Sequence, residues 1–193
     1  RDARSLPFRV LPEGPRVLVI GAAGGQEIAA SLYFGANHIT GVELNPVTYS
    51  LLRHEFADIT GHLAEHPRVS HVNGDGRWFL KQSNEKYDLV WFTAPDSYAA
   101  MGASTAGAFV LTESYLYTVE MIRLSLAHLA PRGIICTQFG EFAYDTKPNR
   151  TTRYLATARA AFADERVAEF PSHVMVASAE GIGPIKESVI VLG

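Results

Sequence analysis

The chain has 193 residues, 47% of them hydrophobic and 19% charged, with a formal net charge of −3. This length and composition are typical of one folded domain with a sizeable core, and they exclude an intrinsically disordered chain. The slightly acidic balance argues against a nucleic-acid partner, and the apolar runs are too short to cross a bilayer. A single cysteine, Cys136, excludes a disulfide framework. Because the chain begins at Arg1 and shows no signal-peptide pattern, we expect a piece of a longer protein.

Strand-like and helix-like segments alternate along most of the chain. Apolar, β-branched runs predict strands at residues 16–20, 38–43, 68–72, 87–92 and 134–138. Helical spacing predicts helices at 26–33, after Asn45, from Arg77, over about 115–129 and at 151–162. Five successive strand–helix units imply a parallel sheet with helices on both faces.

The helix after Asn45 has a clear start signal. Asn45 is a good N-cap and Pro46 suits the first helical position. Leu52, Phe56 and Ile59 then recur at helical spacing and predict one apolar stripe on one helix.

Three histidines near this helix have a spacing that resembles a metal site. His62 and His66 stand four residues apart, with His54 two turns earlier. No cysteine cluster or carboxylate pattern accompanies them, so solvated helix histidines are favoured and no metal is expected.

The end of the chain breaks the alternation. Residues 173–177 and 188–192 read as strands, and the loop between them is too short for a crossover helix, so they must pair antiparallel. A parallel sheet that ends in such a hairpin is typical of the S-adenosylmethionine-dependent transferase fold. We therefore predict one Rossmann-like α/β domain over residues 1–193, with a seven-stranded, mostly parallel sheet in the order 3-2-1-4-5-7-6.

The first strand ends in a turn of small residues. Residues 17–27 read Val-Leu-Val-Ile-Gly-Ala-Ala-Gly-Gly-Gln-Glu, a strand, a turn and a helix start. Small residues let the backbone approach a ligand, and the helix end offers N–H groups. Such a turn also occurs without a ligand, so alone it is a weak signal. The residues here that we predict to contact a cofactor are Gly21, Ala22, Gly24, Gly25, Gln26 and Glu27.

An acidic residue ends the second strand and strengthens the case. Glu43 lies 22 positions after Gly21, where a carboxylate can accept both hydroxyls of an adenosine ribose. Dinucleotide sites share this acid but need G-x-G-x-x-G, and the later glycine positions hold Ala23 and Gln26. Glu27 would also repel a pyrophosphate, whereas it suits a sulfonium or ammonium group. The pattern favours an adenosyl sulfonium over a dinucleotide.

The third strand is followed by Asn-Gly-Asp-Gly at residues 73–76. Asp75 can accept a hydrogen bond from an adenine amino group, or it can merely cap the helix that begins near Gly76. Three features at three successive strand ends nevertheless point to one adenosyl ligand. The predicted contacts outside the glycine turn are Glu43, Leu44, Asn45, Asp75, Gly76 and Thr93.

These segments, in this order, resemble the spermidine/spermine synthase-like (polyamine aminopropyltransferase) family of the class I methyltransferase fold. The resemblance covers about residues 12–165. It is carried by residues 17–25, 42–46, 66–69, 74–80, 85–90 and 111–120, and by Gln138. The chain looks most like the variant branch in which this domain is attached to membrane-spanning segments. That resemblance implies a cytoplasmic domain, not itself membrane-spanning, and it is compatible with a homodimer.

The resemblance also implies a chemistry. The cofactor would be S-adenosylmethionine or its decarboxylated form, the product S-adenosylhomocysteine or methylthioadenosine, and the acceptor a cationic polyamine that receives an aminopropyl group. Asp96 falls where the family holds the acceptor amine. Thr93 falls where the family has the acid that removes a proton, and losing such a base costs about 10²–10⁴ in rate. Gly24 replaces an acid that meets the cofactor's amino end, a role for which Glu27 is the substitute.

Two alternatives and one further segment remain open. A methyltransferase on this scaffold relies chiefly on positioning and needs a base at Thr93 less. A non-catalytic domain that binds an adenosyl nucleoside is the second alternative. Glu141 and Tyr144, after the fifth strand, either line an acceptor site or are exposed loop residues. Only about fifteen residues precede the first strand, so we do not expect the small β domain that precedes this fold in aminopropyltransferases.

Overall fold

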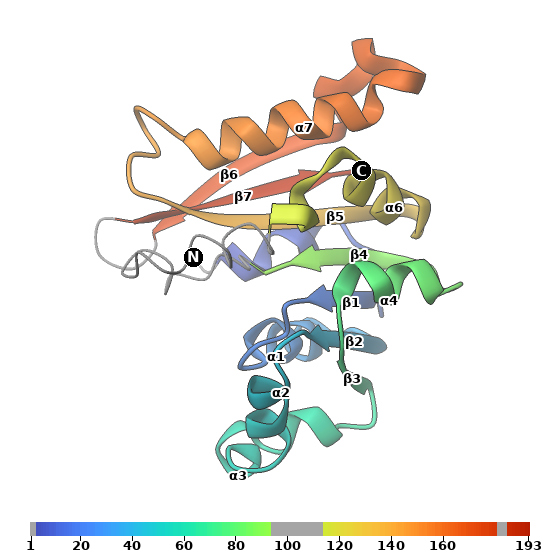
Figure 1. The fold of residues 1–193 in the computed structure, drawn as a ribbon, viewed down its shortest axis with the longest axis vertical. Helices are drawn as coiled ribbons and strands as arrows, with labels where there is room; N and C mark the ends of the chain where they lie inside the picture. The colour runs from blue at the N-terminus through green and yellow to red at the C-terminus, as the bar shows by residue number, and fades with distance from the viewer. Residues whose placement is uncertain (1–2, 94–113, 181–184) are drawn as a thin grey trace.

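A twisted β-sheet forms the centre of the computed structural model, which describes residues 3–93, 114–180 and 185–193 (Figure 1). Its strands are β1 (Arg16–Ile20), β2 (His38–Glu43), β3 (Val69–Asn73), β4 (Tyr87–Phe92), β5 (Leu129–Glu141), β6 (Val174–Glu180) and β7 (Lys186–Leu192). The longer helices are α1 (Gln26–Tyr33), α2 (Pro46–Arg53), α4 (Gly76–Gln82), α6 (Val119–Ala127) and α7 (Asn149–Arg166). Short helical turns are η1 (Ala3–Ser5), η2 (Pro7–Arg9), α3 (Ala57–Thr60), η3 (Leu63–Glu65), η5 (Ser114–Tyr117) and η6 (Val167–His173).

The strand order is β3-β2-β1-β4-β5-β7-β6, which confirms the predicted topology. Strands β1 to β5 pair in parallel, whereas β7 runs antiparallel to both β5 and β6. The chain therefore ends in the predicted hairpin. Because the carboxyl ends of parallel strands meet at one edge, this order also decides where a site can be built.

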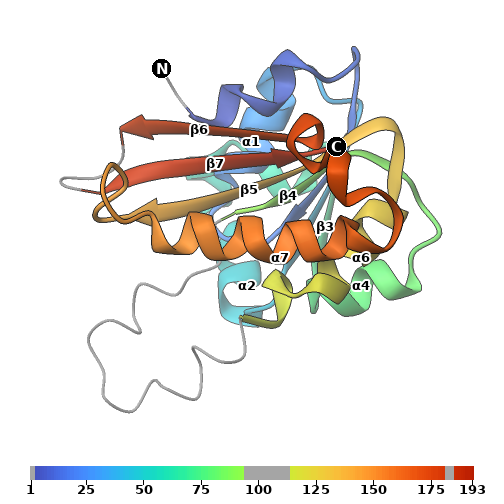
Figure 2. The same ribbon diagram turned by 90° about the horizontal axis from the view of Figure 1, so that it is seen from above.

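Alternate residues of the strands face two separate hydrophobic cores. On one face, Leu18, Val90 and Phe92 pack with residues of α4, α6 and α7. On the other face, Val19 and Trp91 pack with Ile28 of α1 and with the N-terminal segment. Figure 2 shows the sheet between α1 on one side and α4, α6 and α7 on the other. Burial of both faces explains why these strands read as continuous apolar runs.

The N-terminal segment covers part of the sheet, which the sequence pattern did not indicate. The ring of Phe8 in η2 stacks on Phe34, with centroids 4.8 Å apart, and it meets the edge of the Trp91 ring at 5.8 Å. Aromatic pairs at these distances stabilise beyond the area that they bury. This segment therefore packs as part of the domain core.

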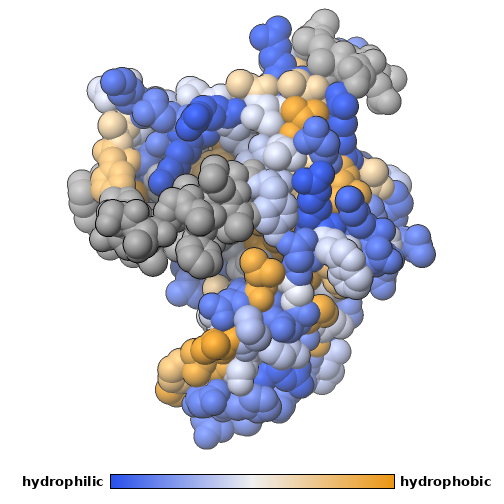
Figure 3. All heavy atoms as spheres, viewed as in Figure 1, coloured by the Kyte–Doolittle hydropathy of each residue, from blue (hydrophilic) through white to orange (hydrophobic). Residues whose placement is uncertain are grey.

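The helix predicted after Asn45 is in fact two short helices, α2 and α3. Leu52 is buried as predicted, but Phe56 and Ile59 are 48% and 81% exposed. The chain leaves the helical conformation at His54, and Gly61 ends α3 in the left-handed region. The prediction of one continuous apolar stripe was wrong because the break rotates α3 out of line. In Figure 3 hydrophobic residues are exposed low in the view, where Figure 1 places α1, α2 and α3.

The three histidines of this region do not share a helical face. His54 follows α2, while His62 and His66 flank η3 at its two ends. His62 lies 3.1 Å from a carboxylate oxygen of Asp58 and 3.4 Å from one of Glu65. Within the described ranges, no group of three His, Cys, Asp or Glu side chains could hold a metal ion.

Two further elements differ from the prediction in how they divide or extend. The expected long helix over about 115–129 divides into η5 and α6, because Thr118 between them caps α6 by accepting from the Met121 amide at 3.3 Å. Strand β5 begins before the predicted turn and continues to Glu141, since β7 pairs with it along residues 135–141. Among the described residues, no helix has the length and hydrophobicity that a membrane span requires.

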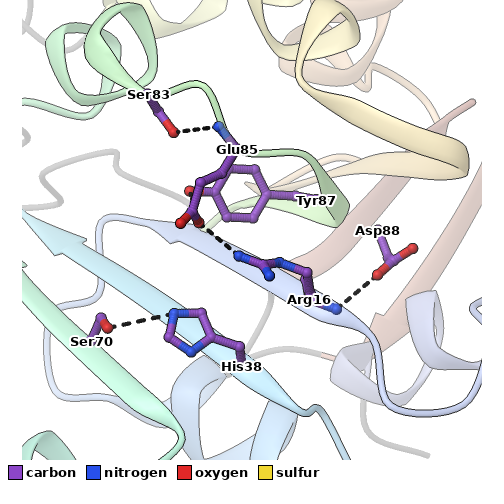
Figure 4. Close-up of polar contacts among 7 residues, drawn as sticks. All are labelled: Arg16, His38, Ser70, Ser83, Glu85, Tyr87 and Asp88. Atoms are coloured by element: carbon purple, nitrogen blue, oxygen red, sulfur yellow. Dashed lines mark hydrogen bonds and ion pairs between the residues drawn. The ribbon is translucent and has the colours of Figure 1, made fainter.

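Polar contacts tie the strands together at the amino edge of the sheet (Figure 4). The Arg16 amide donates to a carboxylate oxygen of Asp88 at 2.8 Å. The Arg16 guanidinium pairs with Glu85 at 2.9 Å, and the Tyr87 hydroxyl donates to the same Glu85 oxygen at 3.4 Å. These charged groups are partnered with one another, so this edge is a structural clasp.

Candidate active site

The strand register brings the predicted site residues to the carboxyl edge. Ile20 of β1 is paired with Val42 of β2 and with Phe92 of β4. Glu43 of β2 is paired with Asn73 of β3. The residues that follow these strands, the glycine turn, Asp75 and Thr93, are therefore neighbours in space, as the sequence predicted.

The glycine turn is held by backbone hydrogen bonds to β2. The amides of Gly21 and Ala22 both donate to the Val42 carbonyl, at 2.9 and 3.0 Å. Gly21 and Gly25 have φ of +87° and +80°, which favours glycine, and Ala23 also has a positive φ of 42°. Gly25 is the N-cap of α1, and a Cβ there would lie 2.5 Å from the Leu63 side chain. The turn is thus a fixed cradle at the start of α1.

Glu43 is buried, with 7% of its surface exposed, and it links two turns. One carboxylate oxygen accepts from the Ala23 amide at 2.8 Å, and the other accepts from the Asn45 amide at 2.8 Å. Each carboxylate oxygen has two lone-pair sites, so each can still accept a further hydrogen bond. The side chain therefore holds the cradle together and keeps the capacity to accept two ribose hydroxyls.

Asn73 braces Glu43 from the neighbouring strand, a role that the sequence reasoning missed. Its amide nitrogen donates to the Glu43 carbonyl at 2.8 Å and to the Leu44 carbonyl at 3.4 Å. The Gly74 amide donates to the same Glu43 carbonyl at 3.0 Å. No sequence signal indicates this contact, because Asn73 and Glu43 are 30 positions apart in the chain.

The segment after Glu43 presents an apolar side chain and a cap. Leu44 is 55% exposed beside the buried Glu43. Asn45 accepts from the Val47 amide at 2.9 Å, so its predicted N-cap role is confirmed. Leu44 therefore exposes an apolar side chain at the same edge of the sheet as Glu43.

Asp75 caps α4 and also contacts a second element. One carboxylate oxygen accepts from the Trp78 amide at 2.7 Å, which supports the capping interpretation. The other oxygen accepts from the Tyr115 hydroxyl. A Cβ at Gly76 would lie 2.5 Å from the Ile20 side chain, so α4 starts tightly against β1. Tyr115 begins the helix predicted over about 115–129, and the structure places it in the turn η5, from which it contacts Asp75.

Thr93 joins the end of β4 to the glycine turn. Its hydroxyl donates to the Gly21 carbonyl at 2.5 Å, and its amide donates to the Ile20 carbonyl at 3.3 Å. The hydroxyl proton is therefore engaged with the backbone, and Thr93 positions the turn. The second predicted catalytic residue, Asp96, lies outside the described residues.

Three predicted contacts lie around the start of α1. Gln26 accepts from the Arg4 guanidinium at 3.0 Å. Glu27 is half-buried in the first turn of the helix. Gly24 is exposed, and a Cβ there would meet no atom within 4 Å. This end of the turn is therefore accessible from solvent.

Two polar residues near the end of β5 are buried. Gln138 is 2% exposed and accepts from the Trp91 indole N–H at 3.1 Å. Glu141 is 5% exposed and accepts from the Thr151 amide at 2.7 Å and the Thr151 hydroxyl at 3.0 Å. The alternative that Glu141 is an exposed loop residue was wrong, because the side chain turns inward to bond the first turn of α7.

Burial raises the pKa of the nearby Cys136 thiol, so this cysteine is not a thiolate nucleophile.

The fold and this edge define a Rossmann-like class I methyltransferase fold. The spermidine synthase from Thermotoga maritima superposes with a TM-score of 0.66 and 15% identity, covering 98% of this chain and 58% of that one. TrmN from Thermus thermophilus superposes with a TM-score of 0.59 and 19% identity, over 98% and 47% of the two chains.

The spermine/spermidine synthase domain family matches residues 4–175, and the chain belongs to that family. A polyamine aminopropyltransferase from Alkaliphilus metalliredigens is 34% identical over 92 residues, which are 47% of this chain and 32% of that protein. Polyamine aminopropyltransferase 2 from Ralstonia nicotianae is 31% identical over 127 residues, or 64% and 22%. The chain thus spans about a third or less of these relatives.

Proposed function

We propose that this chain is the nucleoside-binding domain of a transferase that moves an aminopropyl group from decarboxylated S-adenosylmethionine to a polyamine. The observation that carries the proposal is the buried Glu43 carboxylate, clamped to the glycine turn at 2.8 Å and still able to accept two hydroxyls. The family match over residues 4–175 supports the same chemistry.

Each residue of the edge has a role in this proposal. Glu43 accepts the ribose hydroxyls, and the Leu44 side chain packs against the adenine. Asp75 accepts from the adenine amino group with a lone pair that Trp78 and Tyr115 do not use. When bound, the sulfonium supplies an electrophilic carbon and a good leaving group. Because such a displacement is in-line, catalysis depends mostly on how well these residues fix the geometry.

Thr93 determines the protonation state in which the acceptor amine reacts. Its hydroxyl donates to the Gly21 carbonyl and has no useful basicity, so it does not take the acceptor's proton. We expect the amine to react in its neutral form, and the rate to rise with pH toward the amine's own pKa. Asp96 holds the distal, charged end of the acceptor.

Turnover with isotopically labelled decarboxylated S-adenosylmethionine and putrescine tests the proposal. Labelled spermidine together with methylthioadenosine is the expected product pair. Thr93→Asp should raise the rate at neutral pH by about 10-fold or more, because a carboxylate can accept the proton. Thr93→Val is the matched control, and it should not raise the rate. Absence of polyamine product under conditions where the nucleoside binds would refute the aminopropyl reaction.

Methyl transfer is the second candidate, because the engaged hydroxyl of Thr93 is compatible with it as well. A methyl transfer to a neutral or anionic nucleophile needs no base at this position. Incubation with methyl-labelled S-adenosylmethionine and candidate acceptors separates the two reactions. Label in the acceptor supports methyl transfer, and label only in the nucleoside argues against it.

A further inference from the structure

The N-terminal segment brings a cation to the start of α1. Arg4 lies in η1, and its guanidinium donates to the side-chain oxygen of Gln26 at 3.0 Å. Gln26 is the first residue of α1 and follows Gly25 of the glycine turn. Figure 2 shows the N-terminal segment beside α1. The Arg4 guanidinium is therefore held against the first residue of α1, which follows the glycine turn directly in the chain.

Next to this cation the turn is open. Gly24 is exposed, and a Cβ there would have no neighbour within 4 Å. Its φ lies outside the left-handed region, so other residues can occupy this position without backbone strain. Glycine at this position leaves room for the tail of a bound nucleoside, and it places no negative charge there.

The charged groups at the start of α1 are complementary to a zwitterion. The Arg4 guanidinium and the positive end of the α1 dipole attract an anion. Glu27, half-buried in the first turn, attracts a cation. An α-amino acid carries both groups, an ammonium and a carboxylate. The decarboxylated nucleoside carries the ammonium alone, and it would leave Arg4 without an anionic partner in the ligand.

We propose that this site binds intact S-adenosylmethionine at least as tightly as its decarboxylated form, with Arg4 as the residue that recognises the carboxylate. The inference rests on the proposed function, because it concerns the tail of the same nucleoside. Its consequence is competition: S-adenosylmethionine occupies the site whenever it is the more abundant of the two.

Calorimetry with the two nucleosides on the wild-type chain and on Arg4→Gln tests the role of the guanidinium. The wild type should bind S-adenosylmethionine with a dissociation constant equal to or below that of the decarboxylated form. Arg4→Gln should weaken only S-adenosylmethionine, by about 5-fold, because one exposed ionic contact is lost. Arg4→Lys should restore part of that loss. Arg9→Gln, at an exposed position of η2, is the matched control and should change neither affinity.

A second variant tests the open position. Gly24→Asp should weaken S-adenosylmethionine by about 10-fold, because the new carboxylate repels that of the ligand. The same variant should retain or improve binding of the decarboxylated form, whose ammonium it attracts. Gly24→Ala adds a side chain without charge, and it should leave the ratio of the two affinities unchanged.

The outcomes separate this inference from the proposed function. A wild-type preference of 10-fold or more for the decarboxylated form would overturn the inference and leave the proposed function intact. Equal weakening of both nucleosides by Arg4→Gln would also overturn it, since Arg4 would then act only on the shape of the cradle. If neither nucleoside binds, the proposed function itself fails.

Discussion

The two edges of the parallel sheet carry the same kinds of side chain but use them differently. At the amino edge, Glu85 pairs with the Arg16 guanidinium close to solvent, and Asp88 accepts from the Arg16 backbone amide (Figure 4). At the carboxyl edge, Glu43 is buried and its oxygens accept only backbone amides among the described residues. A buried carboxylate that accepts only from backbone amides keeps spare lone pairs for a ligand. The presence of an acidic residue therefore does not by itself indicate a binding site. The groups that the acid contacts distinguish the proposed binding edge from the structural edge.

Replacement of Glu43 should have the largest effect on nucleoside affinity and on stability. A small effect would contradict the difference between the two edges. Glu43→Ala removes a buried acceptor from two backbone amides and from the ribose. We expect nucleoside binding to weaken by more than 1 kcal/mol, and the free energy of unfolding to fall by about 1–3 kcal/mol. Calorimetry and urea unfolding measure the two effects. An unchanged dissociation constant would show that the pocket is misassigned.

Two neighbouring glycines of the carboxyl edge should respond differently. Gly25→Ala forces a side chain into a left-handed backbone and toward Leu63, so the free energy of unfolding should fall by about 1–3 kcal/mol. Gly24→Ala meets no atom and should stay within about 0.5 kcal/mol of the wild type. Urea unfolding of both variants checks this difference. Similar losses in both would mean that the cradle does not depend on the conformation of Gly25.

A histidine in β3, the strand beside that of Glu43, should make the free energy of unfolding depend on pH. His71 of β3 is buried under Tyr49, with ring centroids 4.5 Å apart. Burial, and then the nearby Arg53 charge, lower the pKa of His71 to about 4. Since the unfolded chain binds this proton near pH 6.5, stability should fall as the pH drops from about 6.5 to 4, by about 1–3 kcal/mol in total.

Urea unfolding across this range, with the wild type and His71→Phe, measures the effect. In His71→Phe the free energy of unfolding should depend much less on pH over this range. His38→Gln, at the amino edge, is the control for removal of a histidine. If His71→Phe kept the full slope, the acid sensitivity would belong to other groups.

The amino edge should give the smallest effect. Glu85→Ala removes a half-exposed ion pair with Arg16, and exposed pairs contribute about 0–1 kcal/mol. We expect a loss of at most about 1 kcal/mol in the free energy of unfolding, less at high salt, and no change in nucleoside affinity. A marked loss of binding in this variant would mean that the two edges are coupled, and the comparison would need revision.

The sequence predicted the strand order, the terminal hairpin and the meeting of the glycine turn with Glu43, because hydrophobic periodicity and strand direction determine them. It also predicted the Asn45 cap from local chemistry. It did not predict that Asn73 and Tyr115 contact Glu43 and Asp75, since these contacts join residues about 30 to 40 positions apart. The break between α2 and α3 was missed because apolar spacing alone does not reveal where a helix leaves its axis.

The central claim is that the carboxyl edge binds an adenosyl nucleoside through Glu43. Titration of methylthioadenosine into the wild type, Glu43→Gln and Glu85→Gln tests it most directly, because this product lacks the charged tail and reports on the nucleoside contacts alone. We predict measurable binding to the wild type and to Glu85→Gln, and affinity at least about 5-fold lower in Glu43→Gln. Equal affinities in all three proteins, or no binding to any, would contradict the account.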